Sequence, residues 1–393
     1  MVGGTHSMRR LILGVLLIAA VAISGAWAGG SGEREAQPAD GFEQWLQEAQ
    51  LGAYQPATED WEAIAEAARS EPELVLYTET SRSFPMLDAF EERYGIKVEA
   101  INLRGTELIE RVRREHASGI RNVGVLMVGS GEVVYDQLLQ RNAVVNYVPR
   151  ELQATMSPGA QEPLLVHRYA IGTWYYKNDA DPNTPPYDNI WAFTTPEWRN
   201  RVALNSPLAS GTTMAYFIGL AHNADEMERL YEEHFGEPIQ LTERNAGLEF
   251  IKRLLENDAR VVPAFRDVSA AVTQGQGYFA GFGAHSAYAG VVRGEYDFNL
   301  DTQVTPAVVS ARIFAIGAEI EAPNTAKLLV RWFMSQEGGA PWWGDDFAAN
   351  PAVQQTGFME ELSLSDFDKL WDSPLEVRLQ LRDEVADIFL LYQ

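Results

Sequence analysis

The chain has no cysteine among its 393 residues. This absence excludes disulfide bonds, thiolate metal sites, a cysteine nucleophile and a lipid-modified N-terminal cysteine. Histidine is also scarce: there are six, and no two stand four residues apart, which argues against a catalytic zinc site. The sequence contains no G-x-S-x-G elbow, no H-E-x-x-H helix and no P-loop. It therefore lacks the common signatures of hydrolases and nucleotide-binding enzymes.

Positive charge is the next shortage. Lysine and arginine number 31 against 55 aspartates and glutamates, which gives a formal net charge of −24. Nucleic acid and anionic membranes repel such a chain, so we expect neither as a partner. The charge serves solubility in our interpretation, with attraction of a cationic ligand as the alternative. A hydrophobic share of 46% predicts globular domains, and the length allows two of them.

The N-terminus carries a short apolar run between a basic start and small residues. Arg9-Arg10 precede the run from Leu11 to Ile23, which is followed by Ala26-Trp27-Ala28. The run is shorter than the roughly 20 residues that a membrane-spanning helix needs. This pattern predicts a secretory signal peptide over residues 1–28, cleaved after Ala28, and an uncleaved anchor is the alternative.

Residues 74 to 112 alternate between strand and helix patterns. The apolar run at 74–77 predicts a buried strand, and apolar residues at helical spacing from Phe84 to Tyr94 predict a helix that ends at Gly95. A second strand pattern covers 96–101, and a second helix pattern follows Arg104. This order predicts a parallel sheet covered by helices. Ligands on such sheets bind beyond the carboxyl ends of the strands, which points to the loops at 78–83 and 104–106.

The rest of the chain adds similar features. A strand at 122–128 precedes Gly129-Ser130-Gly131, and hydroxyl groups with a glycine at 210–213 open an apolar helix. Ordinary turn geometry and N-capping are the alternatives to ligand contact there. A long aromatic strand pattern at 164–177 suits a strand that passes between two lobes. Residues 29–40 indicate a tether, 42–70 an added helical layer, and 357–393 a helical tail.

Four segments, in this order, resemble the family 1 extracellular solute-binding proteins, the periplasmic receptors of ABC importers. The segments are LVLYTETSRSFPMLDAFEERYGIKVEAINLRGTELIERV at 74–112, HRYAIGTWYYKN at 167–178, WAFTTPEWRNRVALNSPLASGTT at 191–213 and NTAKLLVRWFMSQEGG at 324–339. The resemblance extends from about Leu74 to about Trp343, and the ferric-iron-binding branch is the most similar.

The resemblance implies an α/β, two-lobed type 2 periplasmic binding protein fold with hinge-crossing strands and a central ligand cleft. Lobe 1 would comprise 72–168 and 306–345, and lobe 2 would comprise 169–305. Residues 29–71 would form a tether and N-terminal helical extension, and 346–393 a C-terminal helical segment packed on the lobes. The protein would be a periplasmic monomer without enzymatic activity or cofactor. It would capture a small molecule or metal complex by lobe closure and deliver it to an inner-membrane ABC permease.

The resemblance also implies the residues of the cleft. Two arginines among them, Arg82 and Arg266, could bind carboxylate or phosphate, or form ordinary surface ion pairs. Trp174, Tyr175 and Tyr176 could stack on a ring, and core packing is the favoured alternative. The predicted cleft residues are Thr78, Glu79, Thr80, Ser81, Arg82, Gly105, Thr106, Gly129, Ser130, Ser210, Gly211, Thr212, Thr213, Arg266, His285, Ser286 and Tyr288.

Iron-binding members of the family hold ferric ion with adjacent tyrosines, often with a histidine and an acid. Glu107 matches the position of the acid, and Tyr288 is the one tyrosine where the pair is expected, so these two are the candidate metal ligands. The loop after Tyr77 has no histidine. An organic anion, a phosphorylated small molecule or a chelated metal therefore fits the loops better than a bare ferric ion.

Two other functions compete with transport. A secreted carbohydrate-active hydrolase would use paired carboxylates and the ten tryptophans, although no motif pairs any two acids. A sensory module would use the same fold and cleft but report ligand occupancy to a receptor.

Overall fold

The structure is a computed structural model, and it describes residues 41–392 except 180, 182 and 276. The predicted signal peptide and the tether at 29–40 lie outside the described residues. None of the helices in the described part of the chain has the length and apolar character needed to cross a membrane.

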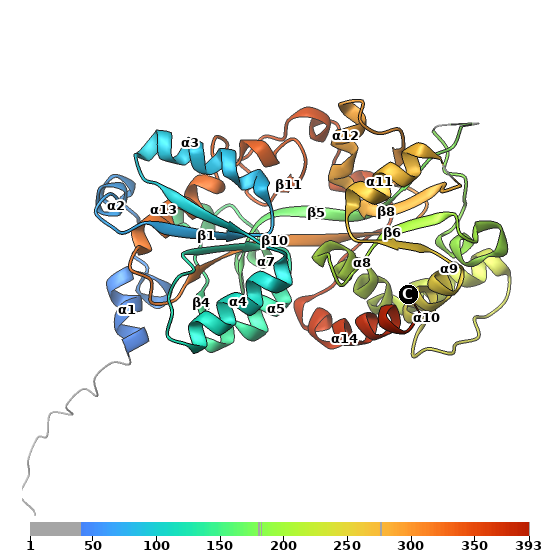
Figure 1. Cartoon of the computed structure of the whole chain (residues 1–393), viewed down its shortest axis with the longest axis horizontal. Coiled ribbons are helices and arrows are strands. Elements are labelled where there is room, and N and C mark those ends of the chain that lie inside the picture. Colours follow the sequence, from blue (N-terminus) through green and yellow to red (C-terminus); the bar gives the residue numbers. More distant parts are fainter. Residues whose placement is uncertain (1–40, 180, 182, 276, 393) are drawn as a thin grey trace, which may run out of the picture. The chain divides into compact units, whose positions relative to one another are not determined.

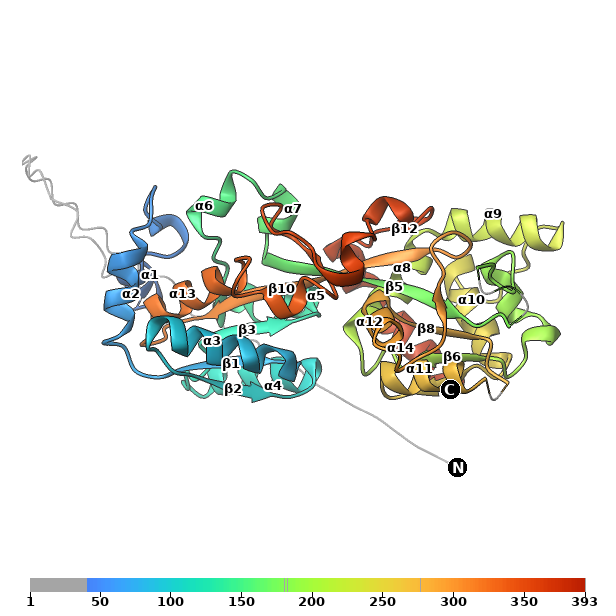
Figure 2. The same cartoon turned by 90° about the horizontal axis from the view of Figure 1, so that it is seen from above.

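A mixed sheet runs through the whole described part of the chain (Figures 1 and 2), in the order β2-β1-β3-β10-β5-β8-β6-β7. Strands within each half are parallel, and the two long central strands, antiparallel to each other, connect the halves. The first half contains β1 (Leu74–Thr78), β2 (Val98–Asn102) and β3 (Val125–Val128). The second half contains β6 (Val202–Asn205), β7 (Arg260–Val262) and β8 (Ala280–Ala284). The central strands are β5 (Leu165–Tyr176) and β10 (Ala307–Gly317).

Short strands pair with these two central strands. They are β4 (Val144–Val145), β9 (Asn299–Leu300), β11 (Phe347–Ala348) and β12 (Leu370–Trp371). Helices cover both halves of the sheet (Figure 1). Around the first half lie α1 (Gly41–Ala49), α2 (Trp61–Ala68), α3 (Phe84–Tyr94), α4 (Gly105–Ala117), α5 (Gly131–Gln137), α6 (Arg150–Gln153), α7 (Pro158–Gln161) and α13 (Pro323–Phe333). Around the second lie α8 (Gly211–His222), α9 (Ala224–Phe235), α10 (Ala246–Glu256), α11 (Phe265–Gln274), α12 (Tyr288–Val292) and α14 (Leu375–Tyr392).

The apolar side chains gather into two main cores, one in each half of the sheet. The first contains Leu76, Phe90 and Leu126, and the second contains Trp174 and Phe217. Each core stabilises one lobe, because burying apolar surface contributes roughly 25 cal/mol of free energy per Å² removed from water. The aromatic run of β5 is core, as favoured above: Trp174 is buried, and its Nε1 donates to the hydroxyl of Tyr216 over 2.7 Å. The lobe boundaries given above remain our proposal.

The local sequence explains the first strand-helix units. β1 is apolar and almost wholly buried, and α3 has Pro85 in its first turn. Gly95 ends α3 in the left-handed conformation, with φ of 69°, which a glycine adopts at no steric cost. Parallel pairing of β1 with β2 and β3 brings the loops after these strands to one edge. The same holds for β6, β7 and β8, so both sets of loops lie where ligands bind in such sheets.

A bulge fixes which side chains of the crossing strands face each side. Arg312 pairs with Arg168, but the next residue, Ile313, pairs with Val166, so His167 is an extra residue in β5. Arg168 and Arg312 lie on the same face because they pair directly, and they line one cleft. The bulge places Val166, two residues before Arg168, on the opposite face. Tyr169 and Ile313 line a different hollow on the opposite face.

The segments at the two ends of the described chain pack on the lobes. Residues of α1 and α2 join the first core, and Glu71 accepts four hydrogen bonds from Asn324 and Thr325 at the start of α13. The prediction of a helical tail over 357–393 is only partly right. Short 3-10 turns and β12 precede α14, which begins at Leu375, directly after Pro374. A proline disfavours helical conformation at the residue before it, so the helix does not extend further toward β12.

Candidate functional site

A cleft of about 330 Å³ lies beside the crossing strands. Its walls come from the loops after β1, β2, β6, β7 and β8, from the two crossing strands, and from the segment before β11. The lining residues are Glu79, Thr80, Arg82, Arg104, Gly105, Arg168, Ala170, Asn205, Ala209, Ser210, Gly211, Pro263, Ala264, Phe265, Ala284, Ser286, Arg312, Trp342 and Asp346. A hollow of about 490 Å³ lies elsewhere, around Arg121 and Glu319, but these two residues already pair with each other. We therefore place the candidate site in the cleft that both lobes line.

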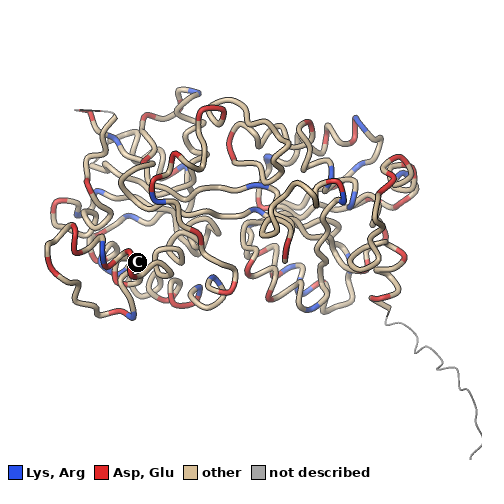
Figure 3. Tube along the Cα trace, turned by 180° about the vertical axis from the view of Figure 1, so that it is seen from behind, with Lys and Arg blue, Asp and Glu red and all other residues tan. Residues whose placement is uncertain are grey.

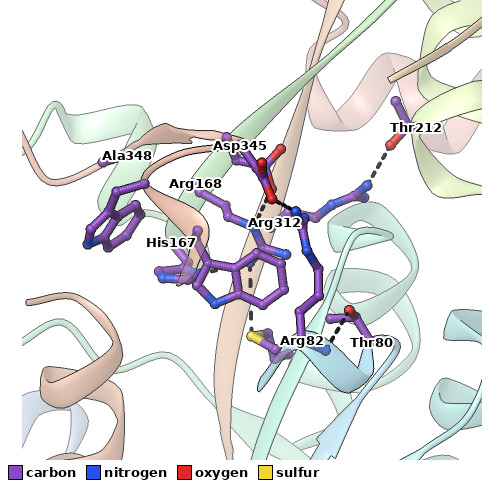
Figure 4. Close-up of polar contacts among 12 residues, drawn as sticks. Thr80, Arg82, His167, Arg168, Thr212, Arg312, Asp345 and Ala348 are labelled. Carbon is purple, nitrogen blue, oxygen red and sulfur yellow. Dashed lines mark hydrogen bonds and ion pairs between the residues drawn. The ribbon is translucent and has the colours of Figure 1, made fainter. Parts of the chain in front are cut away.

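Four arginines line this cleft, although the chain as a whole is strongly acidic. Basic positions lie on the crossing strands between the two groups of helices (Figure 3). Arg82, Arg168 and Arg312 lie close together around Asp345 (Figure 4). A guanidinium group stays protonated at neutral pH and can bind carboxylate or phosphate through two parallel hydrogen bonds.

Arg168 is the most deeply placed of the four, with its side chain only 4% exposed. Its Nε donates to Oδ2 of Asp346 over 2.8 Å, and its guanidinium lies 3.6 Å from the centre of the Trp342 ring. Burial lowers the pKa of Arg168 to about 10, although Asp346 acts in the opposite direction. Arg168 is therefore still a cation at neutral pH, held by an acid on one side and an indole face on the other.

Arg312 connects the two lobes across the cleft. Its Nη2 donates to the hydroxyl of Thr212 in the first turn of α8 over 2.6 Å, and its Nη1 lies 3.6 Å from Oε1 of Glu79. The contact with Thr212 is a hydrogen bond, whereas the contact with Glu79 is a longer ion pair without one.

The other two arginines are nearer the surface of the cleft. Arg82 pairs with Asp345, and its guanidinium lies 5.0 Å from the centre of the Trp342 ring. Burial lowers the pKa of Arg82. Within the described residues, the Arg104 side chain has neither an acidic partner nor a hydrogen bond. Arg104 is therefore the guanidinium that is most available to a ligand.

Three helices begin at the cleft. Arg104 and Gly105 start α4, Ser210 and Gly211 start α8, and Ala264 with Phe265 starts α11. The Ser210 hydroxyl accepts from the Thr213 N–H of α8, but neither α4 nor α11 has a side-chain N-cap. In the part of the chain that the structure describes, their first-turn N–H groups have no side-chain acceptor and carry partial positive charge, which adds to that of the arginines.

Two buried histidines adjoin the site with defined tautomers. Arg168 can only donate, so Nδ1 of His167 accepts from it over 2.8 Å, and Nε2 donates to the Phe333 carbonyl over 3.0 Å. Nδ1 of His285 accepts from the Ile171 N–H, which leaves the hydrogen on Nε2. Burial lowers the pKa of His285 to about 4, so the ring is neutral at pH 7.

Asp346 completes this buried group. Burial alone would raise its pKa, but Arg168 and the other nearby cations hold the pKa below its usual range. Its Oδ2 accepts from Arg168, whereas its Oδ1 and Nε2 of His285 are buried without a hydrogen-bond partner among the described residues. Such atoms carry a desolvation cost that a bound polar group can relieve.

The structure brings many of the sequence-predicted residues to this cleft. Those that line it are Glu79, Thr80, Arg82, Gly105, Ser210, Gly211 and Ser286. Others lie directly behind the lining. Thr78 accepts from the Thr80 N–H, Thr212 binds Arg312, and Thr213 donates to Asn205. Gly129 and Ser130 lie against Gly211, so close that a Cβ on Gly211 would come within 3.1 Å of the Ser130 hydroxyl.

Other predicted residues do not line the cleft. Ser81 and Thr106 are exposed outside it. Arg266 points to solvent with 82% of its side chain exposed, and its nearest acid is its neighbour Asp267. The alternative of a surface position therefore applies to Arg266.

The two predicted metal ligands are not brought together at the cleft. Glu107 lines a separate hollow with Glu110 and Arg111, and Tyr288 packs edge-on against Phe358. Across residues 41–392, leaving aside the three that are not described, no three His, Cys, Asp or Glu side chains are placed to hold a metal ion.

Arg104 lies in the predicted ligand loop at 104–106, although it was not among the named cleft residues. Sequence reasoning missed several other lining residues: Arg168, Arg312, Trp342 and Asp346. A signal for two of them was present. Arg168 and Arg312 each interrupt an apolar strand pattern, LLVHRYAIG and TPAVVSARIFAIG, where a lone charge needs a partner or a function. Asp346 follows the loop after α13 and carries no such signal.

Comparisons with solved structures identify this arrangement. No family model and no curated protein matches the sequence. A putative extracellular solute-binding protein from Bordetella parapertussis superposes with a TM-score of 0.62 at 12% identity, covering 82% of this chain and 99% of that one. Apo ferric ion-binding protein A from Pasteurella haemolytica gives 0.61 at 15%, covering 80% and 96%. The substrate-binding protein of an ABC transporter from Agrobacterium tumefaciens gives 0.60 at 16%, covering 83% and 96%.

The chain has the two-lobed periplasmic binding protein fold. The likeness expected from the four sequence segments is thus confirmed at the level of the fold. In this binding-protein fold the described cleft is the central one, beside the crossing strands.

Proposed function

We propose that this protein is a periplasmic substrate-binding protein that captures a small organic anion by lobe closure and delivers it to an ABC permease. The observation that carries the proposal is the cleft itself, which four arginines line from both lobes and from the crossing strands. Its counter-charges are Glu79, Asp345 and Asp346. Four guanidinium groups against three carboxylates leave one net positive charge in a chain whose overall charge is −24.

The electrostatics favour an anion over a cation. An attraction of about 1 kcal/mol between unit charges 4 Å apart in water rises to about 4 kcal/mol near a protein surface. The uncapped starts of α4 and α11 each add a partial positive charge of about half a unit. The same groups would repel a bare ferric ion. If the bound molecule contains a metal, only an anionic metal chelate fits this cleft.

Lobe closure follows from where the arginines stand. Arg104 belongs to the loops of the first lobe, and Arg168 and Arg312 lie on the crossing strands that form the hinge. The start of α8 in the second lobe brings Ser210 and Gly211 to the same space, and Thr212 behind them accepts a hydrogen bond from Arg312. A ligand that contacts both lobes binds the closed state better than the open one, so it shifts the population toward closure.

The mechanism requires no chemistry on the ligand. Asp346, an acid that could serve a hydrolase, is held by Arg168 with a pKa below its usual range, which makes it a poor proton donor. The predicted signal peptide would take the chain to the periplasm. There we propose that it acts as a monomer and that the loaded, closed form is what the permease recognises.

Calorimetry with inorganic phosphate, citrate, a neutral sugar and a polyamine tests the ligand class. We expect binding by an anion and none by the sugar or the polyamine, together with a smaller radius of gyration in small-angle scattering when the anion is bound. Arg104→Gln should weaken that binding, whereas the matched variant Arg266→Gln should not, because Arg266 points to solvent. Turnover of a ligand, or tight binding of the polyamine, would contradict the proposal.

A further inference from the structure

The carboxylate of Glu79 occupies a particular place in the cleft. It follows β1 and reaches the start of α4, where its Oε2 lies so close to Gly105 that a Cβ there would approach it to 2.6 Å. Its Oε1 would be 3.1 Å from a Cβ on Gly129, and it lies 3.6 Å from Nη1 of Arg312. Two glycines without side chains and one guanidinium therefore surround this carboxylate.

This place has the properties of an anion position. Among the described residues the first-turn N–H groups of α4 have no side-chain cap, and α4 has 13 residues, so its N-terminus carries a partial positive charge of about half a unit. Arg312 supplies a second positive group. Independent of the helix, Oδ1 of Asp346 is a buried acceptor in the same cleft that no described residue satisfies. An ionised carboxylate can only accept, so this atom points to a ligand that carries a hydroxyl or N–H donor beside its anionic group.

Glu79 is held there by charge and not by hydrogen bonds. Within the described residues its carboxylate accepts no hydrogen bond, and its side chain is 23% exposed. Glu71 provides the comparison, because its carboxylate also lies at a helix start, that of α13. There it accepts four hydrogen bonds of 2.7 to 3.0 Å from Asn324 and Thr325. Glu71 is thus a structural cap, whereas Glu79 fills its position without being fixed in it.

We propose that Glu79 is a built-in competitor that occupies the anion position of the ligand-free cleft and must be displaced when the ligand binds. This inference rests on the proposed function, because it assigns a role within the anion-binding cleft. The Glu79 carboxylate is tethered next to the position that it fills, so its effective concentration there is high. It therefore competes with every incoming anion and weakens the observed binding. Glu79 would then exclude weakly held anions and admit those that reach several arginines together.

The test compares Glu79→Gln with Glu107→Gln in the full chain. Both variants remove one negative charge near the first turn of α4, but Glu107 lines a different hollow, so it controls for the general change in field. Calorimetry in a low-chloride buffer would use inorganic phosphate, sulfate and citrate as probes. We expect Glu79→Gln to bind each anion about fivefold more tightly than the wild type does, which corresponds to the loss of one modest ionic contact. Glu107→Gln should bind like the wild type.

The possible outcomes separate the two proposals. Equal affinities of the Glu79→Gln and Glu107→Gln variants, or weaker binding by Glu79→Gln, would overturn the competitor role. If Arg104→Gln weakens phosphate binding in the same series, the proposed anion-binding function is supported even if Glu79 proves not to be a competitor. If wild type and both Glu variants bind none of the three anions, the proposed function and this inference both fail. Urea unfolding of each variant shows whether the proteins compared are equally folded.

Discussion

The two faces of the crossing strands differ sharply, although the same two strands form both. Arg168, Ala170 and Arg312 line the cleft on one face. Tyr169, Val309 and Ile313 line a hollow of about 480 Å³ on the other, beside the segment that leads into α14. Alternation along a strand sends successive side chains to opposite faces. One pair of strands can therefore hold charges for a ligand and an apolar surface for packing, and the two faces should respond differently to substitution.

The largest effect is expected at Arg168. Replacing it by Met leaves Asp346 as a buried carboxylate without its cation, since only 5% of the Asp346 side chain is exposed. We expect a loss of about 4 kcal/mol in the free energy of unfolding, as is typical when one partner of a buried ion pair is removed. Urea unfolding measures it.

The double variant Arg168→Met, Asp346→Asn is the control for this prediction. It removes both charges, so most of the lost stability should return. If the single and the double variants were equally unstable, the cleft face would owe its stability to packing around Trp342 and not to the ion pair.

The second effect is a pH dependence on the same face. The pKa of His285 is about 4 because the ring is buried, against 6.5 for a histidine in water. As the pH falls below 6.5, His285 takes up a proton in the unfolded chain but stays neutral in the folded protein. The free energy of unfolding therefore has its full value above pH 6.5 and decreases as the pH falls to 4. The full difference is about 3 kcal/mol.

His285→Asn separates this contribution from others. The Asn side-chain oxygen can accept the Ile171 N–H as Nδ1 does, but it cannot be protonated. Urea unfolding at pH 7 and pH 4 should show a fall in stability that is smaller than that of the wild type by about 3 kcal/mol. The remaining fall would include His167, whose pKa is also lowered by burial. An equal fall in both proteins would contradict the assignment.

The third effect concerns the ligand. Arg312→Gln removes a cation of the cleft and its hydrogen bond to Thr212. Loss of one charge-assisted hydrogen bond is worth about 2 kcal/mol, so we expect about thirtyfold weaker binding of inorganic phosphate in calorimetry. Arg199→Gln, which breaks an exposed pair with Asp258, is the matched control and should leave the affinity unchanged. Equal affinities in the two variants would show that the ligand does not contact Arg312 on the crossing strands.

The sequence predicted the loops that line this cleft better than the crossing-strand residues Arg168 and Arg312, which form its floor. Strand-helix alternation from Leu74 onward was sufficient to place Thr80, Arg82 and Gly105 at the carboxyl ends of parallel strands, and the structure has them there. The floor depends on long-range pairing. Which face Arg168 takes is decided by the extra residue at His167, and that bulge exists only against a partner strand more than 130 residues away.

The same limit explains why Glu107 and Tyr288 do not meet at the cleft. Each was placed by its position in a pattern, and a position along a helix does not state which surface the residue faces. Glu107 stands in the first turn of α4, two residues after Gly105, and it faces a hollow away from the cleft. Asp346 was missed for a related reason, since contacts between residues far apart in the sequence hold its segment at the cleft: the pairing of β11 with β5 and the ion pair with Arg168.

The smallest effect is expected on the opposite face of the crossing strands, at Ile313. Its side chain is buried in the first core and contributes to the hollow beside α14, away from the arginines. Ile313→Val removes one methyl group, so we expect a loss of about 1 kcal/mol in unfolding free energy and no change in phosphate affinity. Urea unfolding and calorimetry on the same preparation measure both. A change in affinity without a change in stability would show that the two faces are coupled through the hinge, because Ile313 and Arg312 are neighbours at the bulge.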